Sequence, residues 1–467
     1  MMLSSYDMMM AGIAANGKGM AKENFARACL RAYEASAAHA EMREAERYAQ
    51  NRNDIAGRRR MAIGERGVPA EAKNLANNRI AHPFLRRLAM QKVGYLLSRP
   101  FSLQTDDGEL AERLGAYFTK DFRRMLQGVG MAAVTHGIAW LQAYYDEDGA
   151  LCFARRPATE IVPLWRDEDH TCLDAVLRAI EVAVLEKDGS SGGSLRQLEY
   201  YDAQGVTRYP LDNGQDDMPE AIEGEPLFTV DGQPGGWGRI PFIPFKYHAD
   251  ETPLLRYVKP LIDAYDRAVS DAANLIEDVP NAIKVVKGYS GTSPGEFIRN
   301  LATYRTAFVE GDGDLSALAT PLDLSAVEQH LSRLKADIYE AGAGVDTQGI
   351  RLSNVSSETL RMMYNNLDMD CGSMAAEFSA AMADVIWFVL DDWKRRGQGD
   401  FTGAQVEIVW NTDIAVNQSE TVEVLAKSAG MLSRETLLAQ HPLVGDVKQE
   451  LLRIAQEARA AGSAADQ

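Results

Sequence analysis

Apolar residues recur every three or four positions in two segments near the middle of the chain. In the first segment, 252–279, they run from Leu254 to Val279, and this spacing predicts a helix with one buried face. Because Pro260 interrupts the stripe, we expect the regular helix to begin there after a short leading turn. The opposite face is charged and should meet water or polar neighbours: Arg256, Lys259, Asp263, Asp266, Arg267, Asp271 and Glu277.

The second segment, 323–344, repeats the same period and is closed by two glycines. Between the helices, the β-branched residues of 282–287 and 306–309 predict two short strands separated by glycine-rich turns. A loop over 345–356 follows the second helix. From periodicity alone, an ordinary antiparallel pair of helices is the favoured interpretation of both segments.

The regions on either side of these segments contain further apolar patterns, some with the period of a helix and some with the alternation of a strand. Apolar stripes predict helices over 22–50, 78–97, 109–131 and 357–396, the last rich in methionine, and two or three short helices over 419–461. Alternating residues and turn signals predict a hairpin over 138–154 and strands over 175–185, 195–201, 206–210 and 406–410. We expect an exposed basic loop over 51–72, where Arg58, Arg59 and Arg60 could contact phosphate or form a solvated turn.

Length and composition are those of a folded chain of two to four domains: 467 residues, 46% hydrophobic and 25% charged. The formal charge of −18 argues against a protein that grips nucleic acid with a general basic surface. Four scattered cysteines indicate reduced thiols. No run of about 18 apolar residues predicts a membrane span, so we expect no membrane partner.

Catalytic and cofactor motifs give no support for an enzyme, and we predict no catalytic residue, no cofactor and no metal. A GxxxxGK[ST] phosphate loop is missing from the sequence. The acidic clusters at 146–148 and 167–169 would need to converge in space to form a carboxylate pair. A monomeric or dimeric soluble enzyme with a carboxylate-based site therefore remains the alternative hypothesis.

Three stretches, taken in order and spacing, resemble the portal proteins of tailed double-stranded DNA phages of the siphophage type. The first runs from Asn77 to Pro100, and the second links 137–141 and its acidic turn to 160–164. The third joins 240–245 to 261–274. Together they extend over roughly residues 50–400.

The resemblance implies an α+β portal fold with a helical stem, a small α/β clip, a mixed α/β wing and a helical C-terminal crown. Its parts would be the N-terminal wing region 1–251, first stem helix 252–279, clip 280–322, second stem helix 323–344, tunnel loop 345–356, wing long helix and strand 357–418, and crown and tail 419–467. Such proteins form a ring, usually of twelve subunits, at one capsid vertex. The ring conducts DNA during genome packaging and ejection.

The resemblance also implies the partners and the residues that meet DNA. The partners would be further copies of the chain, the terminase large subunit, the head–tail adaptor, the major capsid and scaffolding proteins, and double-stranded DNA. We expect the protein in the virion and, during assembly, in the host cytoplasm. A further interpretation also stays open, in which the chain is a portal relative from a gene-transfer particle. Candidate residues are Gln348, Ile350, Arg351, Leu352 and Asn354 in the tunnel loop, Arg333 and Lys335 in the stem, and Lys284, Lys287, Arg299 and Arg305 in the clip.

Overall fold

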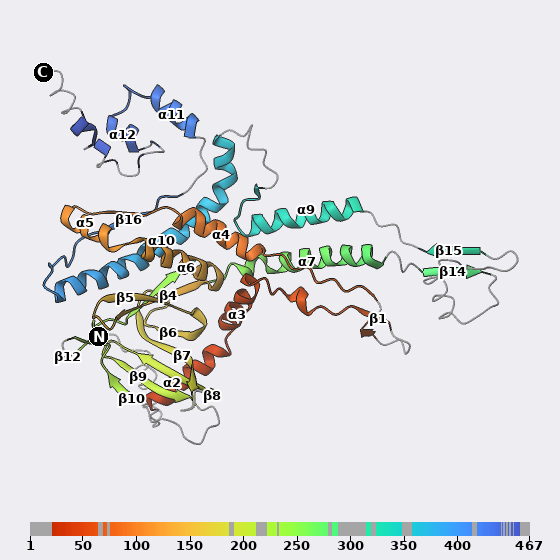
Figure 1. Cartoon of the computed structure of the whole chain (residues 1–467), viewed down its shortest axis with the longest axis horizontal. Coiled ribbons are helices and arrows are strands. Elements are labelled where there is room, and N and C mark those ends of the chain that lie inside the picture. The colour runs from red at the N-terminus through yellow and green to blue at the C-terminus, as the bar shows by residue number, and fades with distance from the viewer. Residues whose placement is uncertain are drawn as a thin grey trace. The chain divides into compact units, whose positions relative to one another are not determined.

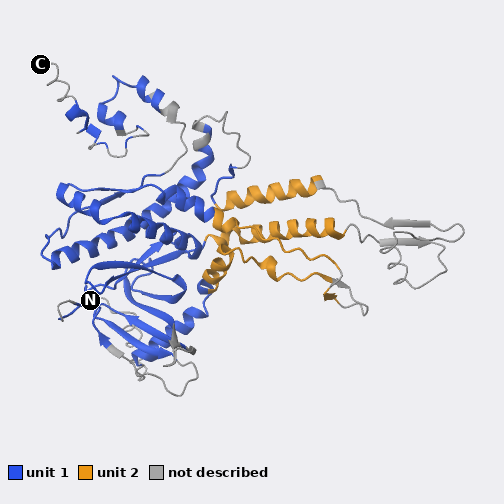
Figure 2. Cartoon of the chain, in the orientation of Figure 1, with its two compact units in different colours: residues 1–39, 88–253, 343–467 blue, residues 40–87, 254–342 orange. Residues whose placement is uncertain are grey.

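The computed structural model places the chain in two compact units, coloured separately in Figure 2. Unit 1 comprises residues 1–39, 88–253 and 343–467, and unit 2 comprises 40–87 and 254–342. Helices and antiparallel sheets are both present, which confirms the α+β prediction. The structure describes residues 21–63, 69–71, 75–185, 191–211, 222–230, 233–278, 283–287, 314–318, 324–347, 357–412 and 418–439, and parts of 441–457.

Unit 1 contains a five-stranded antiparallel sheet with the strand order β10-β9-β8-β7-β6 (Figure 1). Helix α2 (Lys22–Glu34) buries Ala26 and Leu30 against a cluster that contains Leu177, Leu198 and Tyr200 of this sheet. The strands predicted from alternation are therefore confirmed. They are β7 Leu173–Leu185, β8 Ser191–Tyr201 and β9 Val206–Leu211, and two strands that the pattern did not predict complete the sheet: β6 Ile161–Trp165 and β10 Ile222–Glu225.

A three-stranded sheet, ordered β13-β4-β5, forms the second core of unit 1. Helix α6 (Lys120–His136) contacts β4 and helix α10 (Ser357–Arg395) contacts β13. Phe245 of β13 and Phe378 of α10 are fully buried, with ring centroids 5.1 Å apart. The predicted hairpin is confirmed as β4 Ile138–Tyr145 and β5 Leu151–Arg156, and β13 Phe242–Lys246, which the pattern did not predict, completes the sheet.

Helix α10 is long and apolar enough, by length and composition alone, to cross a membrane over Met362–Arg395. The sequence prediction of no such segment was therefore incomplete. However, Phe378, Met382 and Phe388 are buried against the rest of the protein, as in an internal core helix. The other elements that begin or lie in unit 1 are β3 Ser102–Gln104, α5 Gly108–Tyr117, η2 Ala158–Glu160, β11 Phe228–Val230, β12 Gln233–Gly235, β16 Glu407–Val409, α11 Gln418–Lys427 and α12 Arg434–Ala439.

Unit 2 is built around helices α7 (Leu255–Asp278) and α9 (Leu324–Ala341), which pack against each other. Both predicted helices are confirmed, but α7 starts five residues before Pro260, which lies inside its second turn. Strand β14 (Ile283–Lys287) pairs with β15 (Asp314–Leu318), whereas the predicted strand 306–309 lies outside the described residues. Also in this unit are η1 Asp54–Gly57, β1 Met61–Ile63 and β2 Pro69–Glu71.

Three predicted helices differ at their ends or are divided. The segment 22–50 forms α2 and α3 (Ala37–Ala49), and 109–131 forms α5 and α6, because the chain leaves helical geometry at Phe118. Helix α4 (Phe84–Leu97) begins after Pro83 instead of near residue 78. Proline disfavours helical backbone angles in the residue before it, so residues up to 82 remain outside this helix.

Candidate functional site

Helix α7 buries a polar face. Asp266, Ser270 and Asn274 recur every four residues and therefore lie on one side of the helix, and at most 2% of each is exposed. The charged face predicted to meet water or polar neighbours thus meets polar neighbours at Asp266. Buried polar groups of this kind are costly unless hydrogen-bonded.

The partners of this face are backbone amides of residues 76–82, which run antiparallel to the helix. The N–H groups of alternate residues donate to side chains one helical turn apart. The pairs are His82 to Asp266 at 3.0 Å, Ile80 to Ser270 at 3.0 Å, Asn78 to Asn274 at 2.6 Å and Ala76 to Asp278 at 3.0 Å. We call this set of four bonds the polar ladder.

Side chains from residues 53–60 extend these contacts. Asn53 Nδ2 donates to Asp266 Oδ2 at 2.6 Å, and Arg58 and Arg60 pair with Asp271 and Asp278 of α7. The bonds from Ala76 and Arg60 hold the pKa of Asp278 below its usual value. Two of the three clustered arginines therefore pair with carboxylates of α7, whereas Arg59 is exposed, as expected of an exposed loop. Contact between these arginines and phosphate stays a prediction.

The remaining surface of the helix pair carries apolar and charged side chains. Leu275 and Ile276, at the C-terminal end of the predicted apolar stripe, are 46% and 59% exposed, whereas Val258 and Ile262 are buried. Arg333 of α9 is exposed and forms an ion pair with Asp337 at 2.8 Å. Lys335 is half-buried on the same helix. Of the predicted site residues, these two are the ones whose side chains the structure describes.

Of the other predicted site residues, two are described by their backbone alone and the rest lie outside the described residues. Lys284 and Lys287 lie on β14, where their backbones pair with Ala317 and Asp314 of β15. Outside the described residues lie Arg299, Arg305, Gln348, Ile350, Arg351, Leu352 and Asn354. Their roles remain predictions.

A buried ion pair joins α4 to α10, and no sequence pattern predicted it. Lys92 of α4 has no exposed surface, and its Nζ lies 2.6 Å from Asp370 Oδ2 of α10. The Tyr247 hydroxyl donates to Oδ1 of the same carboxylate at 2.8 Å, and His248 Nε2 lies 3.3 Å from that oxygen. Burial alone would raise the pKa of Asp370, but His248, Lys92 and Tyr247 together hold it below its usual value.

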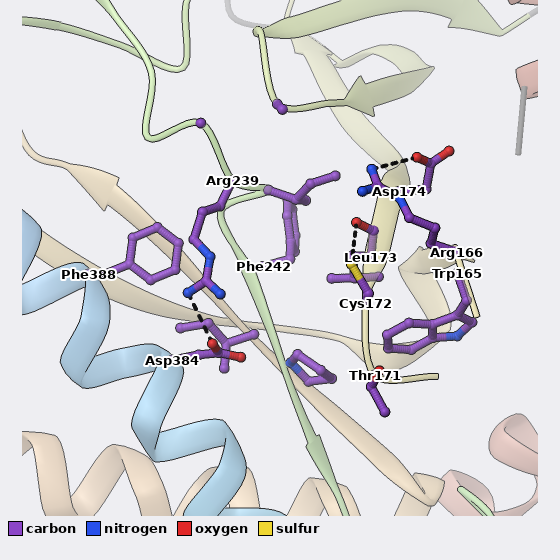
Figure 3. A pocket seen from close by; sticks show the side chains of 15 residues that line it. Trp165, Arg166, Thr171, Cys172, Leu173, Asp174, Arg239, Phe242, Asp384 and Phe388 are labelled. Atoms are coloured by element: carbon purple, nitrogen blue, oxygen red, sulfur yellow. Dashed lines mark hydrogen bonds and ion pairs between the residues drawn. The ribbon is translucent and has the colours of Figure 1, made fainter. Parts of the chain in front are cut away.

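A pocket of about 210 Å³ in unit 1 tests the alternative of a carboxylate-based enzyme (Figure 3). Its two carboxylates are separately paired, Asp174 with Arg166 at 3.0 Å and Asp384 with Arg239 at 3.1 Å. The acidic cluster 167–169 contributes no side chain to the pocket lining. Asp167 instead accepts bonds from the backbone amides of Thr171 and Cys172.

The acidic cluster 146–148 has the same structural role. Asp146 accepts a bond from the Ala150 amide at 2.7 Å and so closes the β4–β5 turn. Among the residues that the structure describes, no three His, Cys, Asp or Glu side chains are grouped to hold a metal ion. The arrangement therefore gives the carboxylate hypothesis no support.

Comparisons with known proteins agree with the resemblance seen in the sequence. The family described as "Phage portal protein, SPP1 Gp6-like" matches residues 32–464. The portal protein of Bacillus phage SPP1 is 27% identical over 419 residues, covering 88% of this chain and 82% of the relative. The portal protein of Clostridium phage phiCD119 is 24% identical over 433 residues, covering 88% and 90%.

One solved structure, titled "Neck of native GTA particle computed with C12 symmetry", has a TM-score of 0.38 and 13% sequence identity to this chain. The alignment covers 77% of this chain and 88% of that one.

Proposed function

The chain belongs to the SPP1 Gp6-like family of phage portal proteins, and from this premise we propose that its copies form a ring that conducts DNA. The ring would occupy one capsid vertex and serve both packaging and ejection of the genome. The single observation that carries the proposal is the family match over residues 32–464. A heterologous contact between copies would close by rotation.

We assign the parts of the ring from the resemblance and the helix pair. Helices α7 and α9 would form the stem, 280–322 the clip, 345–356 the tunnel loop and 419–467 the crown. The packed pair α7 and α9, joined by a segment that contains the β14–β15 pair, supports the stem and clip assignments. The wing would comprise 1–251 and 357–418.

The partners follow from the same proposal. The clip would dock the terminase large subunit during packaging and the head–tail adaptor afterwards, while the wing would meet capsid and scaffolding proteins. ATP hydrolysis would be supplied by terminase, so we expect no enzymatic activity from this chain. The protein would be made in the host cytoplasm and reside in the virion.

The charge balance suits a conduit that does not retain its cargo. Each copy brings a formal charge of −18, and a channel of that sign repels phosphate. The exposed guanidinium of Arg333 is partly neutralised by Asp337. Contacts between DNA and the ring would therefore be weak and brief.

Electron-microscope class averages and native mass spectrometry of the purified protein test the ring directly. We expect closed particles of twelve or thirteen copies with a central hole. Only monomers or dimers, both alone and when co-expressed with scaffolding protein, would contradict the proposal.

The tunnel loop has its own test at Arg351. Replacing this cation by glutamate should leave ring assembly intact and lower the DNA packaged per particle, because the loop would repel the phosphate backbone. The matched control is Arg124→Glu, an equal charge change at an exposed position of α6. Normal packaging by Arg351→Glu rings would remove the loop from the mechanism.

A further inference from the structure

The turn that follows α9 adopts an unfavourable backbone conformation. Ala343 has a φ of 45°, in the left-handed region that residues with a Cβ seldom occupy. Such a conformation is unfavourable and persists only where the surroundings impose it. Alanine has no polar side chain with which to stabilise the turn, so neighbouring residues must hold it.

Two consecutive residues of α4 supply that support. Gln91 Nε2 donates to the Val345 carbonyl at 2.7 Å, and Gln91 Oε1 accepts from the Val345 amide at 3.1 Å. One side-chain amide thus satisfies both backbone groups of one residue. Lys92 Nζ lies 3.4 Å from the Ala343 carbonyl.

The Val345 side chain is fixed as well. It is 4% exposed and packs in a cluster with Tyr95, Leu367 and Cys371. Tyr95 belongs to α4, whereas Leu367 and Cys371 belong to α10. Residues 343–345, which we call the loop root, are therefore held by both helices through hydrogen bonds and apolar contacts.

The two helices are also joined to each other beside the loop root. Lys92 pairs with Asp370 at 2.6 Å, and the Tyr95 hydroxyl donates to Asp368 at 2.6 Å. Removing one partner of a buried ion pair is strongly destabilising. The loop root is thus attached to two helices that an ion pair and a hydrogen bond hold together.

We propose that Gln91 and Lys92 are positioning residues that clamp the loop root to α4 and α10. The clamp fixes where the chain enters segment 345–356 and transmits force on that segment into α10. This inference rests on the proposed function of that segment as the tunnel loop. On this proposal, Gln91 and Lys92 contribute to DNA packaging without having to contact DNA.

Gln91 allows the sharper test, because it is half-buried and uncharged. In Gln91→Ala rings, hydrogen–deuterium exchange of the peptide that contains Val345 should accelerate about tenfold, since two hydrogen bonds are lost. Gln91→Glu keeps the acceptor but loses the donor, so its exchange should be intermediate. The control is Gln127→Ala, which removes a similar bond from Gln127 Nε2 to the Leu97 carbonyl and should leave Val345 unchanged.

Packaged DNA per particle is the functional readout. We expect both Gln91 variants to assemble rings and to package less DNA, with alanine below glutamate. Unchanged exchange at Val345 would overturn the clamp, and faster exchange with normal packaging would overturn its role. Failure of both variants to form rings would show a purely structural residue.

The clamp and the tunnel loop can fail separately. If Arg351→Glu packages normally while Gln91→Ala exchanges faster and packages less, the proposed DNA contact is wrong but the clamp stands.

Discussion

At the scale of single residues, Asp266 shows how much of unit 2 depends on polar contacts. This carboxylate has no exposed surface, yet it accepts bonds from the backbone and the ring of His82 and from Asn53. Those partners lie 184 and 213 residues away in sequence. The face of α7 that binds residues 76–82 is therefore specified by hydrogen bonds as well as by apolar burial.

Ser270 offers a clean test of the polar ladder. Ser270→Ala should lower the free energy of unfolding by about 1 kcal/mol, because the partly buried Ile80 amide loses its acceptor. Chemical denaturation measures the difference. The control is Ser332→Ala at an exposed position of α9, and an equal loss in both variants would contradict a specific role for the ladder.

Asp370 predicts a pH dependence. Its pKa is lowered in the folded protein, so the stability it contributes is present above the unfolded pKa of about 3.9 and is lost as the pH falls through the lower folded value. Asp370→Asn should therefore be less stable than the parent at pH 7 and lose less stability on acidification below about pH 4. Denaturation curves across pH measure this.

The control for that measurement is Asp148→Asn, which removes an exposed carboxylate from the β4–β5 turn. If the parent and the Asp370→Asn protein lost stability in parallel below pH 4, the buried pair would not account for the acid response.

The sequence predicted the environment of individual residues well where one face of a helix determines it. It predicted that environment poorly where two segments distant in the sequence meet. The charges of α7 were expected to face water or polar neighbours, and Asp266 does meet polar neighbours. Periodicity cannot reveal that the neighbours are backbone amides, because every residue but proline has one. For the same reason, no pattern pointed to Gln91 or to the Lys92–Asp370 pair.

At the scale of elements, the connection between α6 and β4 depends on a single residue, Gly137. Gly137 ends α6 with a φ of 83° and leads directly into β4. A Cβ at this position would lie 1.9 Å from the Glu251 carbonyl oxygen. The close approach is part of the fold, since the Gly137 carbonyl also accepts the Tyr247 amide at 2.8 Å.

Gly137→Ala should therefore be among the most damaging small substitutions. We expect a loss of at least about 3 kcal/mol, since left-handed backbone strain and a steric clash add together. The control is Gly115→Ala in α5, where a Cβ meets no atom within 4 Å and alanine should stabilise the helix by up to about 1 kcal/mol. Thermal unfolding of both proteins measures the contrast, and similar melting temperatures would show that the Gly137 turn relaxes freely.

Element types were more predictable than element boundaries. The β4–β5 hairpin and the long helix α10 followed from strong local signals, a turn glycine and an extended apolar period. The local pattern did not predict strand β15, which begins directly after the glycine-containing residues 311–313. Its pairing partner β14 lies 27 residues earlier, beyond the reach of a local pattern.

At the scale of the whole molecule, the proposed ring requires surfaces that a single copy leaves uncovered. Leu275 and Ile276 at the end of α7 are such surfaces in the chain described above. Apolar side chains at this exposure gain free energy when a neighbouring copy covers them. We therefore expect them to contribute to contacts between neighbouring stems.

Ile276→Asp should reduce the fraction of protein in rings without changing the stability of the isolated chain. The reason is that a carboxylate placed in an apolar contact would be buried without a partner. Native mass spectrometry at fixed concentration measures the fraction. Met90→Asp is the control, since Met90 is 56% exposed on α4, and equal loss of rings in both variants would argue against a stem-specific contact.

The polar ladder also restricts which insertions and deletions residues 76–82 and α7 can tolerate. Two residues of extended chain advance about 6.6 Å and four residues of helix advance about 6.0 Å, so donors and acceptors stay in step over the four bonds. Deleting one residue from 76–82 would turn alternate amides away from α7 and break the pairing beyond it. Viable insertions or deletions should therefore add or remove two residues here together with four in α7, and homologous chains of different length can be inspected for that coupling.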